Sequence, residues 1–192
     1  MKFVLSTRNA HKVRELADLL PSHELAPLPD EVVLPPETAA DFAGNALIKA
    51  RAACEALGVA AIADDSGLCA DALGGAPGVR SARYAGEHAT DEENLQKLID
   101  HVPPGSGLSY VCVIAVVLPD GTERTVEGRC TGTMATERRG DGGFGYDPVF
   151  LADADPAGRT MAQLTDAEKG AISHRGMAVE ALGPVLDELA DR

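Results

Sequence analysis

The amino-acid sequence predicts an α/β fold with a mixed sheet, on three observations. Short apolar runs of strand length alternate with amphipathic segments of helical period along most of the 192 residues. The first such pair is a strand over Lys2 to Ser6, a polar turn, and a helix that runs to about Leu20, where a proline ends it. Two β-rich runs, 109–118 and 123–133, flank a Pro-Asp-Gly turn and predict a long antiparallel β-hairpin.

Local signals predict the other elements. A helix is expected over 41–57, because its apolar residues recur at helical spacing and Gly58 follows as a C-terminal cap. Two capping boxes, Thr90–Glu93 and Thr165–Glu168, open further helices, the first of which extends to about Val102. Short strands are expected at 24–28, 58–62 and 149–151, and a terminal helix at 177–190.

The composition favours one globular domain over residues 1–192. With 45% hydrophobic residues the chain can bury a sizeable core, and it has no stretch near the roughly 20 apolar residues that cross a bilayer. The N-terminus turns polar too early for a signal peptide, so the cytoplasm is the expected compartment. A net charge of −13 opposes binding to a nucleic-acid polymer, but not to a small anion held by local cations. The four cysteines form no Cys-x-x-Cys pair and are interpreted as small core residues.

The stretch A-D-D-S-G-L, Ala63 to Leu68, is where an apolar run meets two adjacent acids. A buried strand cannot continue through two carboxylates without a counter-charge, so we expect it to end there, with Asp64 and Asp65 at its C-terminal edge. That edge is where open α/β sheets hold their ligands. Adjacent strand residues point to opposite faces, so one acid would face a ligand and the other a hydrogen-bonding neighbour. Taken alone, the motif is equally typical of a polar turn.

The turn after the first strand is a candidate anion site. The N–H groups of a helix start, together with Thr7, Asn9 and Lys12, place several donors on a few residues. A Walker A pattern is absent, and an ordinary capped helix accounts for the same residues. On the helix expected over 41–57, Asn45 and Lys49 are four residues apart and therefore share a face.

A second candidate region is the glycine-rich loop from Gly140 to Pro148, which contains two aromatic residues. An aromatic ring beside glycines can stack on a nucleobase, and an adjacent carboxylate can read the N–H edge of the base. A hairpin loop with two anchoring aromatics is the alternative. His174 and Arg175 precede the terminal helix, where a donor pair could meet a carbonyl, although a histidine there usually caps or packs.

Six motifs follow one another along nearly the whole chain: T-x-N-x-x-K, E-T with F-x-x-N-A-x-x-K-A, A-D-D-S-G-L, L-G-G-A-P-G-x-x-S-A-R-Y, G-G-F-G-Y-D-P-x-F and A-I-S-H-R-G. In this order they resemble the inosine triphosphate pyrophosphatase family, also called dITP/XTP pyrophosphatases. The resemblance implies Mg²⁺-dependent hydrolysis of noncanonical purine nucleoside triphosphates, namely ITP, dITP and XTP, to the monophosphate and pyrophosphate. It also implies a homodimer and an elongated fold of two lobes around a central cleft.

The resemblance further implies roles for individual residues. Asp65, the second acid of A-D-D-S-G, matches the family's proton acceptor, and Asp65, Glu37 and Asp64 would hold Mg²⁺. The phosphates would be bound by Thr7, Arg8, Asn9, Ala10, His11, Lys12, Lys49 and Ser66. The base would stack on Phe144 and contact Gly145, Tyr146, Asp147, Lys169, His174 and Arg175. Donors that meet its 6-oxo group would disfavour a 6-amino group, because each buried donor left unpaired costs about 1–3 kcal/mol.

Two positions depart from the family pattern. Gly44 stands where glutamate is usual, so one carboxylate of the usual cluster is missing, and Arg8 stands where glycine is frequent. Two other classes therefore stay open: a Maf-like pyrophosphatase for other modified nucleotides, and a protein that binds nucleotides without turnover. The Gly140 loop and the S-H-R-G motif disfavour the first class, and retention of both Asp64 and Asp65 disfavours the second.

Overall fold

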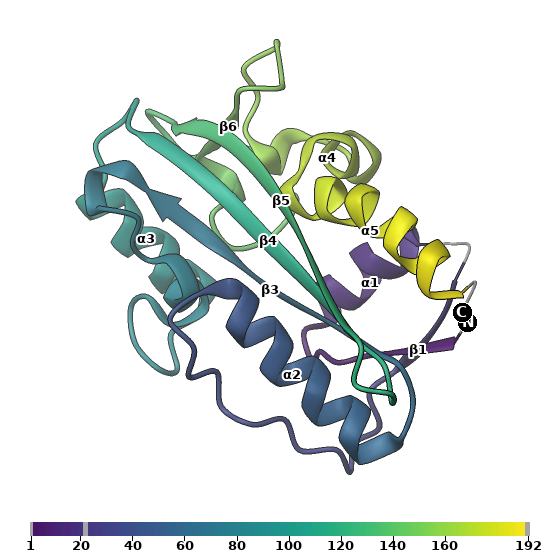
Figure 1. The fold of residues 1–192 in the computed structure, drawn as a ribbon. Helices are drawn as coiled ribbons and strands as arrows, with labels where there is room; N and C mark the ends of the chain where they lie inside the picture. Colours follow the sequence, from purple (N-terminus) through teal and green to yellow (C-terminus); the bar gives the residue numbers. More distant parts are fainter. Residues whose placement is uncertain (1, 21–22, 191–192) are drawn as a thin grey trace. The chain divides into compact units, whose positions relative to one another are not determined.

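The computed structural model describes residues 2–20 and 23–190, with the backbone alone for residues 10, 11, 18 and 19. Figure 1 shows its helices and strands coloured along the sequence. The strands are β1 (Lys2–Leu5), β2 (Glu24–Pro27), β3 (Ala61–Ala70), β4 (Gly107–Val117), β5 (Glu123–Met134) and β6 (Phe150–Ala152). The α-helices are α1 (Ala10–Leu19), α2 (Phe42–Leu57), α3 (Asp91–His101), α4 (Asp166–Ile172) and α5 (His174–Ala190).

The described strands form one six-stranded sheet in the order β2-β1-β3-β4-β5-β6. Strand β1 pairs in parallel with β2 and β3, whereas β5 and β6 are antiparallel. A short turn joins the neighbouring strands β4 and β5, and in it the Leu118 N–H donates to the Thr122 carbonyl. The predicted α/β class, the mixed sheet and the long hairpin are therefore confirmed.

The chain divides into two compact units. The first comprises Met1–Asp65, Cys112–Gly128 and Ala178–Arg192, and the second comprises Ser66–Val111 and Arg129–Met177. A single domain over residues 1–192, with two lobes around a cleft, stays a prediction.

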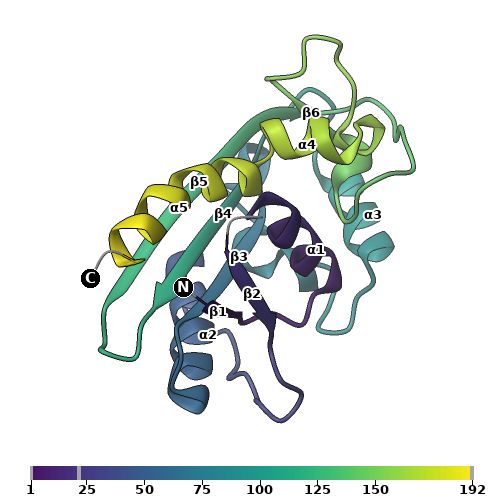
Figure 2. The same ribbon diagram turned by 90° about the vertical axis from the view of Figure 1, so that its right-hand side faces the viewer.

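The core of the first unit packs one face of its strands against two helices. Phe3, Ile62 and Ile114 contribute alternate strand residues, and Leu16 of α1 and Leu182 of α5 pack against them. The intervening strand residues point the other way, toward the side along which α2 runs (Figures 1 and 2). These intervening residues, Val4, Ala61, Ala63, Val113 and Ala115, are also buried, as are Ala46, Ala50 and Ala53 of α2.

The second unit has its own apolar core. Leu68 of β3, Leu98 of α3 and Phe150 of β6 belong to one buried cluster with Tyr110 of β4. Helix α3 begins at the predicted capping box, in which Thr90 and Glu93 exchange hydrogen bonds. The capping box of Thr165 and Glu168 likewise opens α4, which confirms both sequence signals.

Strand β3 is the main departure from the predicted elements. It was expected to end near Ile62, but it continues through both acids to Ala70. The reason is that each carboxylate meets a lysine, Asp64 with Lys12 and Asp65 with Lys49, so the counter-charge whose absence would have ended the strand is present.

Smaller differences concern one helix start and one cysteine. Helix α5 begins at His174, three residues earlier than predicted. Cys54, Cys112 and Cys130 are buried as expected, but Cys69 is only partly buried. Within residues 2–20 and 23–190, no helix is both long and apolar enough to cross a membrane.

Candidate active site

Asp64 and Asp65 point to opposite faces of β3, as the strand period requires. Asp64 is fully buried, and one of its carboxylate oxygens lies 2.9 Å from Lys12 Nζ. Asp65 is 5% exposed and faces α2, where Asn45 Nδ2 donates to it at 3.0 Å. The prediction that the two acids point to opposite faces is therefore confirmed, whereas the expectation that one of them faces a ligand stays a prediction.

Around Asp65, three side chains of the first unit form a compact polar group. Lys49 Nζ lies 2.6 Å from a carboxylate oxygen of Glu37 and 3.7 Å from one of Asp65. The Asn45 amide oxygen accepts the N–H of Ala39 at 2.9 Å, so this side chain links Asp65 to the segment that carries Glu37. We call Lys12, Glu37, Asn45, Lys49, Asp64 and Asp65 the acid–lysine cluster.

Electrostatics in this cluster shift two pKa values. Burial raises the pKa of Asp65, and the positive charge of Lys49 opposes that shift without cancelling it. Burial alone would lower the pKa of Lys49, but the negative charges of Asp65, Asp64 and Glu37 outweigh it, and the net pKa is raised. The lysine therefore stays charged, and Asp65 is a more basic carboxylate than an exposed aspartate.

The predicted phosphate turn is held largely by its own hydrogen bonds. The Asn9 side-chain oxygen accepts the N–H of Lys12 at 3.3 Å, and the Thr7 hydroxyl oxygen accepts the N–H of Asn9 at 3.2 Å. Asn9 thus caps the start of α1, as the alternative interpretation expected. Ala10 and His11 are the first residues of α1, and their side chains lie outside the described part of the structure.

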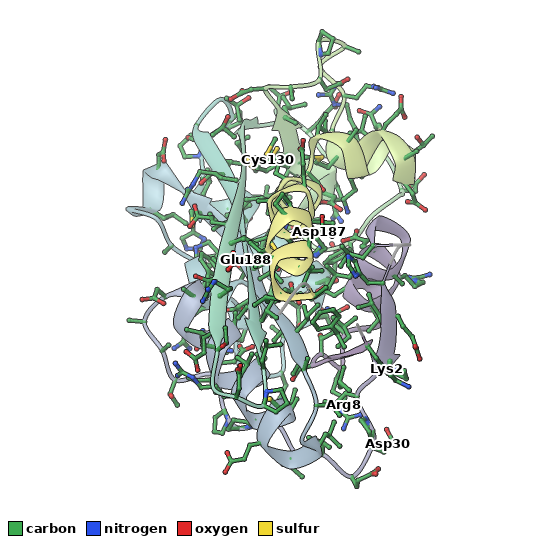
Figure 3. The ribbon with its side chains drawn as sticks, turned by 45° about the vertical axis from the view of Figure 1, so that its right-hand side comes forward. Lys2, Arg8, Asp30, Cys130, Asp187 and Glu188 are labelled. Atoms are coloured by element: carbon green, nitrogen blue, oxygen red, sulfur yellow. The ribbon has the colours of Figure 1, made fainter. Side chains whose placement is uncertain are left out.

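Arg8 is directed to a neighbouring loop. Its guanidinium donates to the carbonyls of Leu28, Pro29 and Val32 and pairs with the exposed carboxylate of Asp30 at 3.1 Å. Figure 3 shows Arg8 and Asp30 side by side. In this structure Arg8 therefore fastens the proline-rich loop onto the turn after β1, which explains why an arginine is accommodated there.

The donors of the acid–lysine cluster suit a hard cation. Glu37 and Asp65 both reach Lys49 Nζ, so two carboxylates converge on one point that already holds a positive charge. No group of three His, Cys, Asp or Glu side chains gathers as a metal cage anywhere in the described ranges. Mg²⁺ usually takes one or two protein carboxylates and completes its shell with water and substrate phosphates. Glu37 and Asp65 fit that pattern, while Asp64 lies on the Lys12 face of the strand.

In the second unit, Asp147 is the centre of another buried polar group. Its Oδ1 accepts the Tyr110 hydroxyl at 3.1 Å. Its Oδ2 accepts the Phe144 N–H at 3.0 Å and pairs with Lys169 Nζ at 2.8 Å. Gly143 makes this close approach possible, because a Cβ on that residue would collide with the Asp147 carboxylate. We call Tyr110, Phe144, Asp147, Lys169 and His174 the Asp147 cluster.

Two aromatic side chains of the Gly140 loop have different surroundings. Lys169 Nζ lies over the Phe144 ring, 4.8 Å from its centroid, and Phe144 is partly exposed. Tyr146 is buried, and its hydroxyl donates to the Ser81 carbonyl at 2.7 Å. Phe144 is therefore the ring of this loop that a base can approach, and Tyr146 anchors the loop. Gly145 lies between them at φ 61°, a conformation that favours glycine.

His174 and Arg175 are more buried than residues at a helix start usually are. Arg175 is 1% exposed, and its guanidinium donates to the Ser66 hydroxyl at 3.1 Å. The His174 ring stacks on Tyr110 with centroids 4.7 Å apart. The sequence does not single out Tyr110, because a tyrosine within an apolar strand indicates only an aromatic residue of the core.

Comparison with known proteins identifies relatives over nearly the full length. The model of the Ham1 family matches residues 3–185. The dITP/XTP pyrophosphatase of Streptomyces coelicolor is 47% identical, with 98% of each chain covered. That of Frankia alni is 49% identical with the same coverage. A solved HAM1 protein from Coxiella burnetii superposes with a TM-score of 0.87 at 41% identity, covering 98% of this chain and 99% of the other.

Proposed function

Because the chain belongs to the Ham1 family, we propose that it is a nucleoside-triphosphate pyrophosphatase that acts on ITP, dITP and XTP. The products would be the nucleoside monophosphate and pyrophosphate. Relatives that carry the name dITP/XTP pyrophosphatase at nearly half identity over almost the whole chain support this reaction class.

The observation that carries the proposal is the environment of Asp65. A buried carboxylate that is oriented by the Asn45 amide can accept a proton from a water molecule. Beside it, Lys49 keeps its positive charge next to Glu37 and can offset the charge of a triphosphate.

We propose the following step. The oxygen of a water molecule bonds to the α-phosphorus while the bond to the bridging oxygen of the β-phosphate breaks. Asp65 takes the proton of the water, and pyrophosphate leaves with the bond's electron pair. Glu37 and Asp65 are the proposed Mg²⁺ ligands. Asp64, which the resemblance also implied as a ligand, lies on the opposite face of β3 against Lys12. When bound by Glu37 and Asp65, Mg²⁺ would neutralise phosphate charge as the leaving group departs.

Other residues are proposed to hold the two ends of the substrate. Lys12, Lys49, Ser66 and the turn after β1 would bind the phosphates through cations and N–H donors. Phe144 would stack on the base, and His174 and Arg175 would donate to its 6-oxo group. A 6-amino group, as in adenine, would leave one of these donors unpaired, whereas guanine keeps the 6-oxo group and differs from hypoxanthine at its 2-amino group.

The assay is pyrophosphate release from ITP, dITP, XTP, ATP, GTP, dUTP and dTTP, with and without Mg²⁺. We expect turnover only with the metal and a strong preference for the first three. Preference for pyrimidine substrates would instead support a Maf-like enzyme. Binding of ITP without turnover, in a folded sample, would support a nucleotide-binding protein.

A homodimer that works in the cytoplasm on free nucleotides is the proposed setting. The support for the dimer is the resemblance to the family alone, and light scattering coupled to gel filtration tests it. A monomer at micromolar concentration that hydrolyses ITP would contradict the dimer and leave the reaction in place.

A further inference from the structure

The ring of Tyr110 stacks with two other rings of the second unit. The Phe150 ring lies with its centroid 4.4 Å from that of Tyr110, at an interplanar angle of 28°. His174 stacks with centroids 4.7 Å apart and an angle of only 13°. A nearly parallel stack restrains the imidazole plane, since tilting or sliding it loses contact with the neighbouring ring.

The hydroxyl of Tyr110 reaches the centre of the Asp147 cluster. It donates to Asp147 Oδ1 at 3.1 Å, while Oδ2 of the same carboxylate holds Lys169 Nζ and the Phe144 N–H. The Asp147 carboxylate therefore connects Tyr110 to both Phe144 and Lys169, the two residues that are expected to contact the base. The hydroxyl remains a donor, because burial first and the charge of Asp147 second raise its pKa well above the usual value.

Tyr110 itself is unsuited to touch a ligand. It is 7% exposed, lies within strand β4, and belongs to the buried core of the unit. Its influence must pass through the side chains that it contacts. A rigid strand with a packed ring is a better support than a glycine-rich loop for groups that must hold a base edge.

We propose that Tyr110 is a positioning residue for base selection, whose ring sets the plane of His174 and whose hydroxyl fixes Asp147. This rests on the proposed function, because it assumes that His174 and Phe144 meet the base. The ring of Tyr110 should contribute more to base selection than its hydroxyl does. The ring contacts His174 directly, whereas Asp147 would still accept hydrogen bonds from Phe144 N–H and Lys169 if the hydroxyl were absent.

The test compares Tyr110→Phe, which removes only the hydroxyl, with Tyr110→Leu and Tyr110→Met, which remove the ring. The readout is the ratio of kcat/KM for ITP to that for ATP. We expect the ring-less variants to lose about tenfold or more in this ratio, mainly through a higher KM for ITP. The phenylalanine variant should stay within about threefold of the parent.

A second readout does not depend on turnover. The imidazole C–H proton resonances of His174, assigned with His174→Gln, should move downfield in both ring-less variants and stay nearly unchanged in Tyr110→Phe, because the stacked ring shields them. Phe3→Leu is the matched control for lost core packing, since Phe3 is a fully buried aromatic of the first unit. It should leave both the selectivity ratio and these resonances unchanged.

The outcomes separate the two proposals. If the parent does not prefer ITP, the proposed function fails, whatever the resonances show. If the parent is selective and a folded ring-less variant keeps its selectivity, or if Phe3→Leu loses as much, the role of Tyr110 is overturned. If Tyr110→Leu fails to fold, Tyr110→Met decides by the same criteria.

Discussion

At the scale of single residues, this protein places charges inside a sheet by pairing each of them. Asp64 and Lys12 form one pair, and Asp65 shares Lys49 with Glu37. Removing one member of such a group leaves a buried charge without its partner, which costs more than the pair contributes. The catalytic and structural roles of these side chains are therefore separated by matched sets of substitutions and not by a single one.

Asp65→Asn should lower the rate of pyrophosphate release from ITP by a factor of about 10²–10⁴, because the amide cannot accept the proton of the water molecule. The fold should persist, since the amide can still bond with the Asn45 side chain after a rotamer flip. Initial rates and circular dichroism measure the two effects. Asp187→Asn, an exposed position on α5, is the control and should behave as the parent. A rate near the parent's in Asp65→Asn would remove the proton-acceptor assignment.

The Lys49–Asp65 pair should show strong non-additivity in stability. Lys49→Met leaves Asp65 and Glu37 without their cation and should cost about 3 kcal/mol in the free energy of unfolding. In the double variant with Asp65→Asn, one uncompensated charge disappears, so the loss should be smaller than the sum of the single losses by about 1–3 kcal/mol. Urea denaturation measures all four proteins. Simple additivity would mean that the two groups do not interact.

At the scale of elements, the helix starts determine how the site segments are held. Asp41 caps α2 by accepting the Gly44 N–H at 2.7 Å, and Thr165 with Glu168 closes the capping box of α4. Gly44 also lets the segment before α2 pack closely, because a Cβ there would lie 2.5 Å from the Ala39 Cβ. The absence of the usual glutamate is thus coupled to the local path of the chain that carries Glu37.

Gly44→Ala should therefore destabilise the protein by about 1–3 kcal/mol, although alanine is the better helix former, because the added methyl group meets Ala39. Gly183→Ala on α5 is the matched control. A Cβ there meets nothing within 4 Å beyond its chain neighbours, and the following Pro184 offsets the helix preference of alanine, so the free energy of unfolding should change by less than about 0.5 kcal/mol. Thermal unfolding of both variants, and of Gly44→Ala combined with Ala39→Gly, tests the clash. The combination should recover most of the loss.

The capping box of α4 should make part of the stability sensitive to acid. Hydrogen bonds from the Thr165 backbone N–H, from Arg159 and from the Thr165 hydroxyl lower the pKa of Glu168 to about 2. A lowered folded pKa stabilises the fold above the unfolded value of about 4.5, and this contribution fades as the pH falls toward 2. The difference in urea midpoint between the parent and Glu168→Gln should hold steady above about pH 5.5 and narrow below it.

The hydroxyl partner of Glu168 offers the control for this experiment. Thr165→Ser keeps an oxygen that can cap the helix and should resemble the parent, whereas Thr165→Val should lose about 1 kcal/mol at pH 7. If the midpoint difference for Glu168→Gln were independent of pH between 7 and 3.5, the carboxylate would not be the stabilising group.

At the scale of the whole molecule, the net charge of −13 repels an anionic substrate, and cations at the site must offset this repulsion. A triphosphate approaches an acidic protein, and the carboxylates proposed to bind the metal repel it unless a cation intervenes. Binding of the nucleotide, and not only its turnover, should therefore depend on Mg²⁺.

A non-hydrolysable ITP analogue should raise the melting temperature in the presence of Mg²⁺. At 100 times its dissociation constant, the ligand would stabilise the folded state by about 2.7 kcal/mol. With EDTA the shift should be much smaller, and the corresponding ATP analogue should give a smaller shift under either condition. An equal shift with and without the metal would show that the lysines alone hold the phosphates.

Much of the fold could be predicted from the sequence, because the signals that specify these helices and the hairpin are local. The 41–57 helix with its glycine cap, both capping boxes and the hairpin around 118–122 depend on spacing, propensity and turn chemistry within a few residues. The order of motifs likewise indicated the family, since six short patterns in sequence are independent of how the chain folds.

Contacts between distant segments were decided only by the tertiary structure. The sequence placed Asp64 and Asp65 on opposite faces, but it could not show that Lys12 and Lys49 supply their counter-charges, and so it ended β3 at Ile62 instead of Ala70. Arg8 on the 28–32 loop is a contact of the same kind. So is the stack of Tyr110, 64 residues before His174, whose meeting depends on how strand β4 and the start of α5 pack. Burial and charge pairing depend on how distant segments pack, so they cannot be inferred from the local sequence.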